Sequence, residues 1–166
     1  MLKTASVLAA AALGFAGLAG ASSASAATIA PAGGSFTLTG TLTLSQTTTV
    51  NCAVTLTGTV NAAGTAATIT GGSFAPGSWQ CGWLVVPSGF PWTVTPNSTT
   101  QITVSGIAAS SIAGSCSGTV SLDWNNATPG SATFKAAPNN QIGGSPSVCT
   151  LVGTLTASSS TPLSIS

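Results

Sequence analysis

The sequence predicts an all-β fold, either an antiparallel β-sandwich or a barrel-like domain, with an internal duplication and two disulfides. Three observations predict it. Apolar and polar residues alternate along several segments, and beyond residues 1–26 no segment keeps the helical period. Clusters of Gly, Pro, Ser and Asn separate these segments, as turns do in two-layer β folds. Four cysteines lie in the same part of the chain, where export would favour disulfides.

The first residues have the three parts of a secretory signal peptide. Lys3 supplies a positive charge, residues 7–18 are apolar, and residues 24–26 read Ala-Ser-Ala, a small-residue cleavage site. The apolar segment is shorter than the roughly 20 residues that a transmembrane helix needs. We therefore expect a signal peptide over residues 1–26 and a single all-β domain over residues 27–166. The exported protein, with no stable transmembrane anchor, is expected outside the cell or on its surface, with the periplasm as the alternative.

Alternating residues place the strands in order along the mature chain. Apolar residues alternate with threonine over residues 36–44 and again over residues 50–60, which predicts two half-buried strands. Asn61-Ala62-Ala63-Gly64 follows and is typical of a hairpin turn. Further strands are expected at residues 66–70, 79–86, 92–95, 101–107, 116–124, 132–135 and 149–155.

The two halves of the mature chain repeat the same order of features. Residues 52–74 and residues 116–134 each begin with a cysteine and an alternating strand that contains a Gly-Thr-Val triplet. A turn with Asn and Gly follows in both halves, and then a short strand that ends at or near Phe. This similarity indicates a duplication.

The duplication also bears on the disulfides, for which three pairings are open. The two intervals within the halves are similar in length, which favours one bridge inside each half. In the chain-entropy model each bridge would stabilise the fold by about 3 kcal/mol. The favoured pairs are Cys52 with Cys81 and Cys116 with Cys149.

The scarcity of charge excludes most functional classes. After residue 26 the charged side chains are Asp123 and Lys135, and the whole chain has no His and no Tyr, although 43% of it is apolar. Acid–base catalysis by paired carboxylates, a His-activated nucleophile, a complete metal shell and a basic surface for nucleic acid all lack their residues. Gly114-Ser115-Cys116-Ser117-Gly118 resembles a nucleophile elbow without acid or base partners. We expect no enzyme activity, no catalytic residue, no metal and no cofactor.

Two features remain for binding. Four aromatic residues close together in the sequence form a candidate apolar binding surface, although core packing is the favoured interpretation because Trp is usually buried. Strands without Lys or Glu are also prone to edge pairing, so self-association is expected. The expected partners are therefore hydrocarbon or another apolar surface, and copies of the protein itself. The four aromatic residues are Trp79, Trp83, Phe90 and Trp92.

Several of these segments resemble the bacterial PraA/PraB family, called activators of alkane oxidation. The resemblance is carried by residues 52–61 (CAVTLTGTVN), Phe90-Pro91-Trp92, residues 114–118 (GSCSG) and residues 124–128 (WNNAT). It implies a small secreted or surface protein that assists growth on long-chain alkanes through hydrocarbon access, surface attachment or the biofilm matrix. It implies no catalytic residue.

Two other functions stay open at this point. A pilin-like or adhesive fibre subunit would also be an exported, Cys-containing β domain with Thr-rich strands, and it would assemble by strand addition. The alternating tail up to Ile165 is partly similar to a pilin C-terminal strand, although it has no Tyr. A secreted domain that binds hydrophobic ligands is the third candidate, and it would require the aromatic residues to line an open pocket.

Overall fold

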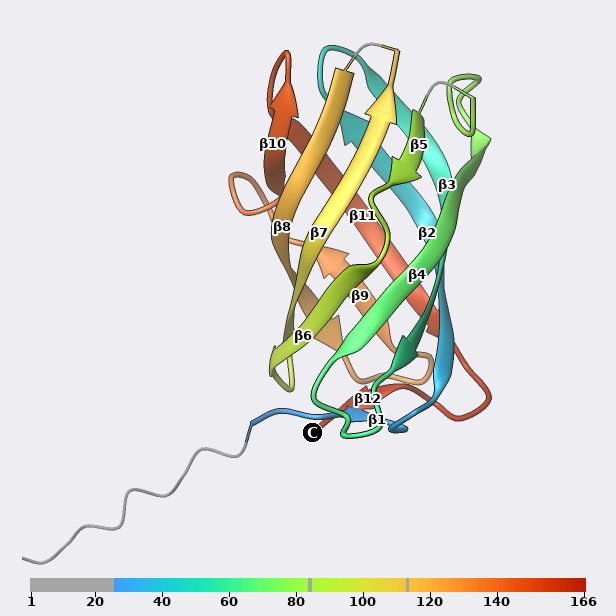
Figure 1. The fold of residues 1–166 in the computed structure, drawn as a ribbon, viewed down its shortest axis with the longest axis vertical. Coiled ribbons are helices and arrows are strands. Elements are labelled where there is room, and N and C mark those ends of the chain that lie inside the picture. Colours follow the sequence, from blue (N-terminus) through green and yellow to red (C-terminus); the bar gives the residue numbers. More distant parts are fainter. Residues whose placement is uncertain (1–25, 84, 113) are drawn as a thin grey trace, which may run out of the picture.

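The strands close into an antiparallel barrel around one core (Figure 1). The computed structural model describes residues 26–83, 85–112 and 114–166, and no helix occurs among them. The barrel has eight positions, so the barrel-like alternative of the predicted fold is confirmed. Apart from Ala26, the expected signal peptide lies outside the described residues.

Six long strands and two divided positions make up the wall. The long strands are β2 (Ser35–Ser45), β3 (Thr49–Val60), β4 (Ala67–Gly77), β7 (Gln101–Ser111), β8 (Gly114–Asn125) and β11 (Cys149–Ser158). The divided positions hold two short strands each, namely β5 (Val85–Ser88) with β6 (Trp92–Ser98), and β9 (Ser131–Phe134) with β10 (Gln141–Ser145). Pairing of β11 with β2 and of β7 with β8 closes the sheet.

The alternating pattern of the sequence becomes the two faces of this wall. In β3 the residues at every second position, from Val50 to Val60, point into the core and are buried. Threonines occupy the outer face, and pairing across strands sets Thr39 of β2 beside Thr55 of β3 and Thr156 of β11. The barrel therefore has an apolar interior and a polar but almost uncharged outer wall.

Three segments differ from the sequence-based expectation. A strand was expected at residues 79–86, but residues 79–83 lie in a loop and β5 begins at Val85. β10 was not expected at all. β4 continues to Gly77 through the Ala75-Pro76 pair, seven residues beyond the strand end expected at residue 70. The register between β3 and β4 shifts between Cys52 and Val54, so the Ala-Pro pair lies in a bulge, where a proline costs no ladder hydrogen bond.

A two-stranded sheet covers the lower end of the barrel in Figure 1. β1 (Ile29–Ala30) pairs with β12 (Ser164–Ile165), and the side chains of Ile29, Leu163 and Ile165 are buried against the core. We call this the closed end. It joins the beginning of the described chain to its last residues.

Asn126 fixes the closed end through polar contacts. Its Oδ1 accepts hydrogen bonds from the indole Nε1 of buried Trp124 at 2.7 Å and from the backbone N of Ile165 at 2.8 Å. Its Nδ2 donates to the carbonyl of Ile165 at 2.8 Å. One amide side chain therefore links the end of β8 to β12.

Both disulfides lie toward the opposite end, which we call the open end. Cys52–Cys81 and Cys116–Cys149 are the pairs that the sequence favoured, so the predicted connectivity is confirmed. Cys52 and Cys116 lie near the beginnings of β3 and β8, and their partners are Cys81 in the loop after β4 and Cys149 at the beginning of β11. The two bridges thus occupy matching places in the two halves of the barrel.

Candidate functional site

Large apolar side chains are exposed mainly at the open end. Among the described residues, Trp79 is 77% exposed, Trp83 89%, Ile112 83% and Val148 54%, and all four lie in loops between strands at this end. We call these four residues the apolar rim. A group of exposed large apolar side chains commonly marks an interaction surface in a soluble protein.

The loop that carries the two tryptophans is tied to β3. The Cys52–Cys81 bridge anchors its middle, and the backbone N of Ser78 donates to the carbonyl of Asn51 at 2.9 Å. Gly77 has a φ of +150° where the chain leaves β4, and a Cβ there would collide with the Asn51 carbonyl. The loop that carries both indoles is therefore held against β3 by the disulfide and the hydrogen bond.

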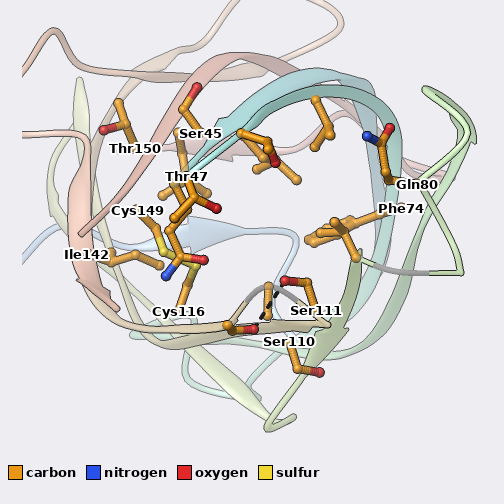
Figure 2. A pocket seen from close by; sticks show the side chains of 18 of the residues that line it. Ser45, Thr47, Phe74, Gln80, Ser110, Ser111, Cys116, Ile142, Cys149 and Thr150 are labelled. Carbon is orange, nitrogen blue, oxygen red and sulfur yellow. Dashed lines mark hydrogen bonds between the residues drawn. A yellow bond between two sulfur atoms is a disulfide. The ribbon is translucent and has the colours of Figure 1, made fainter. Parts of the chain in front are cut away.

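A cavity of about 220 Å³ opens at this end of the barrel, and Trp79 and Ile112 of the rim line it. Figure 2 shows Phe74 and Ile142 on opposite walls, with the Cys116–Cys149 bridge beside Ile142. Among the described residues, none that lines the cavity is charged. Its deeper apolar lining is contributed by Leu44, Val50, Phe74, Ile107, Ile142 and Leu151.

A glutamine holds one side of the cavity mouth in place. Gln46 lies between β2 and β3, and its Nε2 donates to the carbonyls of Ser145 and Ser147, both at 2.9 Å. These acceptors belong to the end of β10 and the loop after it. The Gln46 amide therefore joins the β2–β3 loop to the β10–β11 loop.

A smaller apolar void of about 60 Å³ lies deeper in the barrel. Phe74, Ile107 and Leu151 line both spaces, so they form the floor of the upper cavity and the ceiling of the void. The void continues toward the closed end, where Leu163 and Ile165 line it. The interior is thus apolar along its length, and the upper cavity opens at the open end.

A family model described as "Alkane oxidation protein activator PraA/PraB-like" matches residues 1–165. The chain belongs to this family. No curated protein and no solved structure matches it. Membership in the PraA/PraB-like family confirms the resemblance seen in the sequence, and the family is described by an activating role in alkane oxidation rather than by a reaction of its own.

In this PraA/PraB-like protein the four aromatic residues of the sequence analysis separate into two groups. Trp79 and Trp83 lie on the apolar rim, so core packing does not describe them. Trp92 is 3% exposed, stacks on Phe90 with ring centroids 4.6 Å apart, and donates from Nε1 to the carbonyl of Ser88. Trp92 is therefore a core residue of β6. The exposed surface contains two of the four expected aromatic residues, Trp79 and Trp83.

Half of the apolar rim, Ile112 and Val148, was not expected from the sequence. Ile112 and Val148 are single apolar residues within Ser- and Gly-rich segments, so no periodicity marks them. The cavity itself depends on barrel closure, which brings β4, β7, β10 and β11 together. Only the position of Ile112 and Val148 in the sequence could have indicated them. Ile112 lies between two predicted strands, and Val148 lies beside Cys149.

The two charged residues in the described part of the chain lie away from this site. Lys135 Nζ and Asp123 Oδ1 form an ion pair at 3.0 Å on the outer wall, beside the part of β8 nearer the closed end. Within the described residues, no group of three His, Cys, Asp or Glu side chains could hold a metal ion. None of the described residues belongs to a helix that could span a membrane. The open end offers apolar contact and neutral hydrogen-bonding groups.

Proposed function

We propose that this PraA/PraB-like protein is an exported, non-enzymatic protein that assists growth on long-chain alkanes by attaching to hydrocarbon through its apolar rim. The observation that carries the proposal is the gathering of exposed Trp79, Trp83, Ile112 and Val148 at one end of an almost uncharged barrel. The two disulfides suit an exported protein.

The energetics favour adsorption at an oil–water interface. Transfer of a large apolar side chain out of water contributes about 3 kcal/mol, so two exposed indoles and two aliphatic side chains supply a strong driving force. No charged group must lose its hydration with them, because the ion pair lies on the wall nearer the closed end. The threonine-covered wall and the closed end would remain in water.

The same geometry supports a role in surface attachment and in the biofilm matrix. A protein held by one end presents its neutral wall to neighbouring copies, and the lack of charge repulsion favours their association. We propose self-association as a consequence of adsorption, on oil or on another apolar surface.

The pilin-like alternative gains no support from the fold. Strand addition needs an unpaired long edge or a donor strand. Across the described residues each long strand has a paired neighbour on both sides, although β4 pairs with β6 only over Ala67–Ile69, and the C-terminal residues Ser164–Ile165 are already paired with β1. The proposal therefore rests on the apolar rim and not on strand exchange.

Purified protein tests the attachment directly. The double variant Trp79→Ala/Trp83→Ala should adsorb more weakly to a hexadecane–water interface, as pendant-drop tensiometry would measure. Val152→Ala, which shortens an exposed side chain on the outer wall, is the matched control and should adsorb like the wild type. Equal adsorption of the double variant and the wild type would contradict the role of the rim.

Cells test the physiological part. Deletion of the gene should slow growth on hexadecane and leave growth on a soluble carbon source unchanged, and the wild-type gene should restore growth better than the Trp79→Ala/Trp83→Ala gene. Unchanged alkane growth and unchanged surface attachment after deletion would overturn the proposed function.

A further inference from the structure

We infer that the cavity at the open end binds the end of a single unbranched alkyl chain, inserted between the barrel walls. This inference rests on the proposed function for its biological setting, but it concerns a different part of the molecule. The rim would contact an apolar surface, whereas the cavity would enclose one molecule taken from that surface.

The chemistry of the lining selects an uncharged, apolar ligand. Phe74, Ile107, Ile142 and Leu151 form the deep walls and floor, and none of the described residues that line the cavity is charged. An ionised group placed there would lose its hydration without gaining an opposite charge. A saturated alkyl chain has no polar group that would lose its hydration on entry. Its contacts with these side chains replace contacts with water.

The size of the cavity suits a narrow chain. A closed apolar cavity of about 150 Å³ is large enough to bind benzene, and apolar cavities of this kind stay dry when empty. By proportion, the 220 Å³ available here would hold a segment of roughly nine carbon atoms. A longer chain would project through the mouth.

The mouth defines the orientation of such a chain. Polar side chains, among them Thr47, Gln80 and Thr150, occur at the upper part of the lining, and the depth is apolar. A methyl terminus would therefore enter first, and an alcohol or carboxylate at the other terminus would stay at the mouth or in water. The shared ligand is the alkyl chain, which a free alkane or the tail of an amphiphile can supply.

Trp79 connects the cavity with the apolar rim. Its side chain is 77% exposed and also lines the cavity, so one indole borders both the outer surface and the interior. A chain leaving a hydrocarbon surface would pass from contact with the rim into the cavity without crossing water.

Isoleucine methyl groups report binding in the unmodified protein. Protein with ¹³C-labelled isoleucine methyls would be titrated with n-dodecane, 1-dodecanol and dodecanoate, each below its own aggregation limit. Ile107 and Ile142 line the cavity, whereas Ile29 and Ile165 lie at the closed end and are internal controls. We expect saturable shifts at Ile107 and Ile142, and none at Ile29 and Ile165, with all three compounds. The dodecane arm tells whether a chain without a headgroup suffices. Shifts confined to the amphiphiles would assign the site to amphiphile tails, and no shift at Ile107 and Ile142 would overturn the inference.

A filled cavity provides the second test. Ala109 of β7 lines the cavity, and its chain neighbour Ala108 does not. Ala109→Phe should weaken dodecane binding by about tenfold or more, because the loss of two buried methylenes already corresponds to that factor. Ala108→Phe is the matched control and should bind like the wild type, and thermal unfolding would confirm that both variants are folded. Undiminished binding by folded Ala109→Phe would overturn the inference.

The two proposals fail in different experiments. If Ala109→Phe adsorbs to hexadecane normally but no alkyl chain binds to the wild type, the cavity inference fails and the proposed function stands. If chains bind in the cavity while the wild type neither adsorbs nor supports alkane growth, the proposed function fails and the cavity remains a ligand site.

Discussion

The two ends of the barrel are built in opposite ways. At the closed end, Ile29, Leu163 and Ile165 are buried, and Asn126 links Trp124 to the last strand by hydrogen bonds. At the open end, large apolar side chains face solvent and both disulfides lie nearby. One end buries its apolar groups, and the other exposes them.

This difference has a thermodynamic consequence. Apolar side chains that remain in water contribute nothing to folding through burial, so the open end must be ordered by other interactions. The disulfides and the Gln46 hydrogen bonds supply that order without covering the rim or filling the cavity. Ordering an apolar site in advance lowers the entropy cost of binding, which is what a site for featureless hydrocarbon requires.

The largest expected loss of stability comes from a substitution at the closed end. Trp124→Ala removes a buried ring from the core and leaves Asn126 without its indole donor, so the free energy of unfolding should fall by about 3–5 kcal/mol. Trp83→Ala at the open end should change it by no more than about 0.5 kcal/mol, because that side chain is already 89% exposed. Guanidinium denaturation of both variants measures the contrast. Similar losses in the two variants would show that the rim tryptophan is packed in solution.

The fold could be predicted further from the sequence than the site could. In β2 and β3 the alternation of Thr with apolar residues determines which face is buried, so the strands and their inward residues follow from local pattern. The cysteine intervals within the two halves likewise favoured the correct pairing. These features repeat along the chain, and the barrel preserves them.

The site depends on contacts that have no local signature. The sequence places Trp79 and Trp83 in an expected strand. They lie in a loop instead, because the Cys52–Cys81 bridge and Gly77 turn the chain away from the sheet. The cavity is created only when distant strands close the barrel. The role of Asn126 at the closed end is also invisible in the sequence, where its segment is typical of an ordinary turn.

A smaller effect should follow from removing one bridge, and it tests how the open end is ordered. Cys52→Ala/Cys81→Ala should lower the free energy of unfolding by about 2–4 kcal/mol and release the loop that carries Trp79 and Trp83. Hydrogen exchange should then accelerate in this loop, while the backbone N–H of Ile165 at the closed end keeps its protection relative to global unfolding.

The second bridge is the matched control for this prediction. Cys116→Ala/Cys149→Ala should cost a similar free energy of unfolding, because the two loops that the bridges close are similar in length. It should leave the loop of Trp79 and Trp83 protected and loosen the side of the mouth near Gln46 instead. If either pair of substitutions exposed both ends equally, the two ends would form one cooperative unit and the contrast between them would not extend to dynamics.

The smallest expected effect concerns the ion pair on the outer wall. Asp123→Asn breaks its contact with Lys135, yet the Asp123 side chain is 61% exposed, so the free energy of unfolding should change by less than about 1 kcal/mol. Adsorption to hexadecane and dodecane binding should stay at wild-type values, because both depend on an uncharged end of the molecule. Denaturation and tensiometry of Asp123→Asn and of Lys135→Gln measure this. Weaker adsorption in either variant would mean that charge on the wall, and not apolar area at the open end alone, orients the protein at the interface.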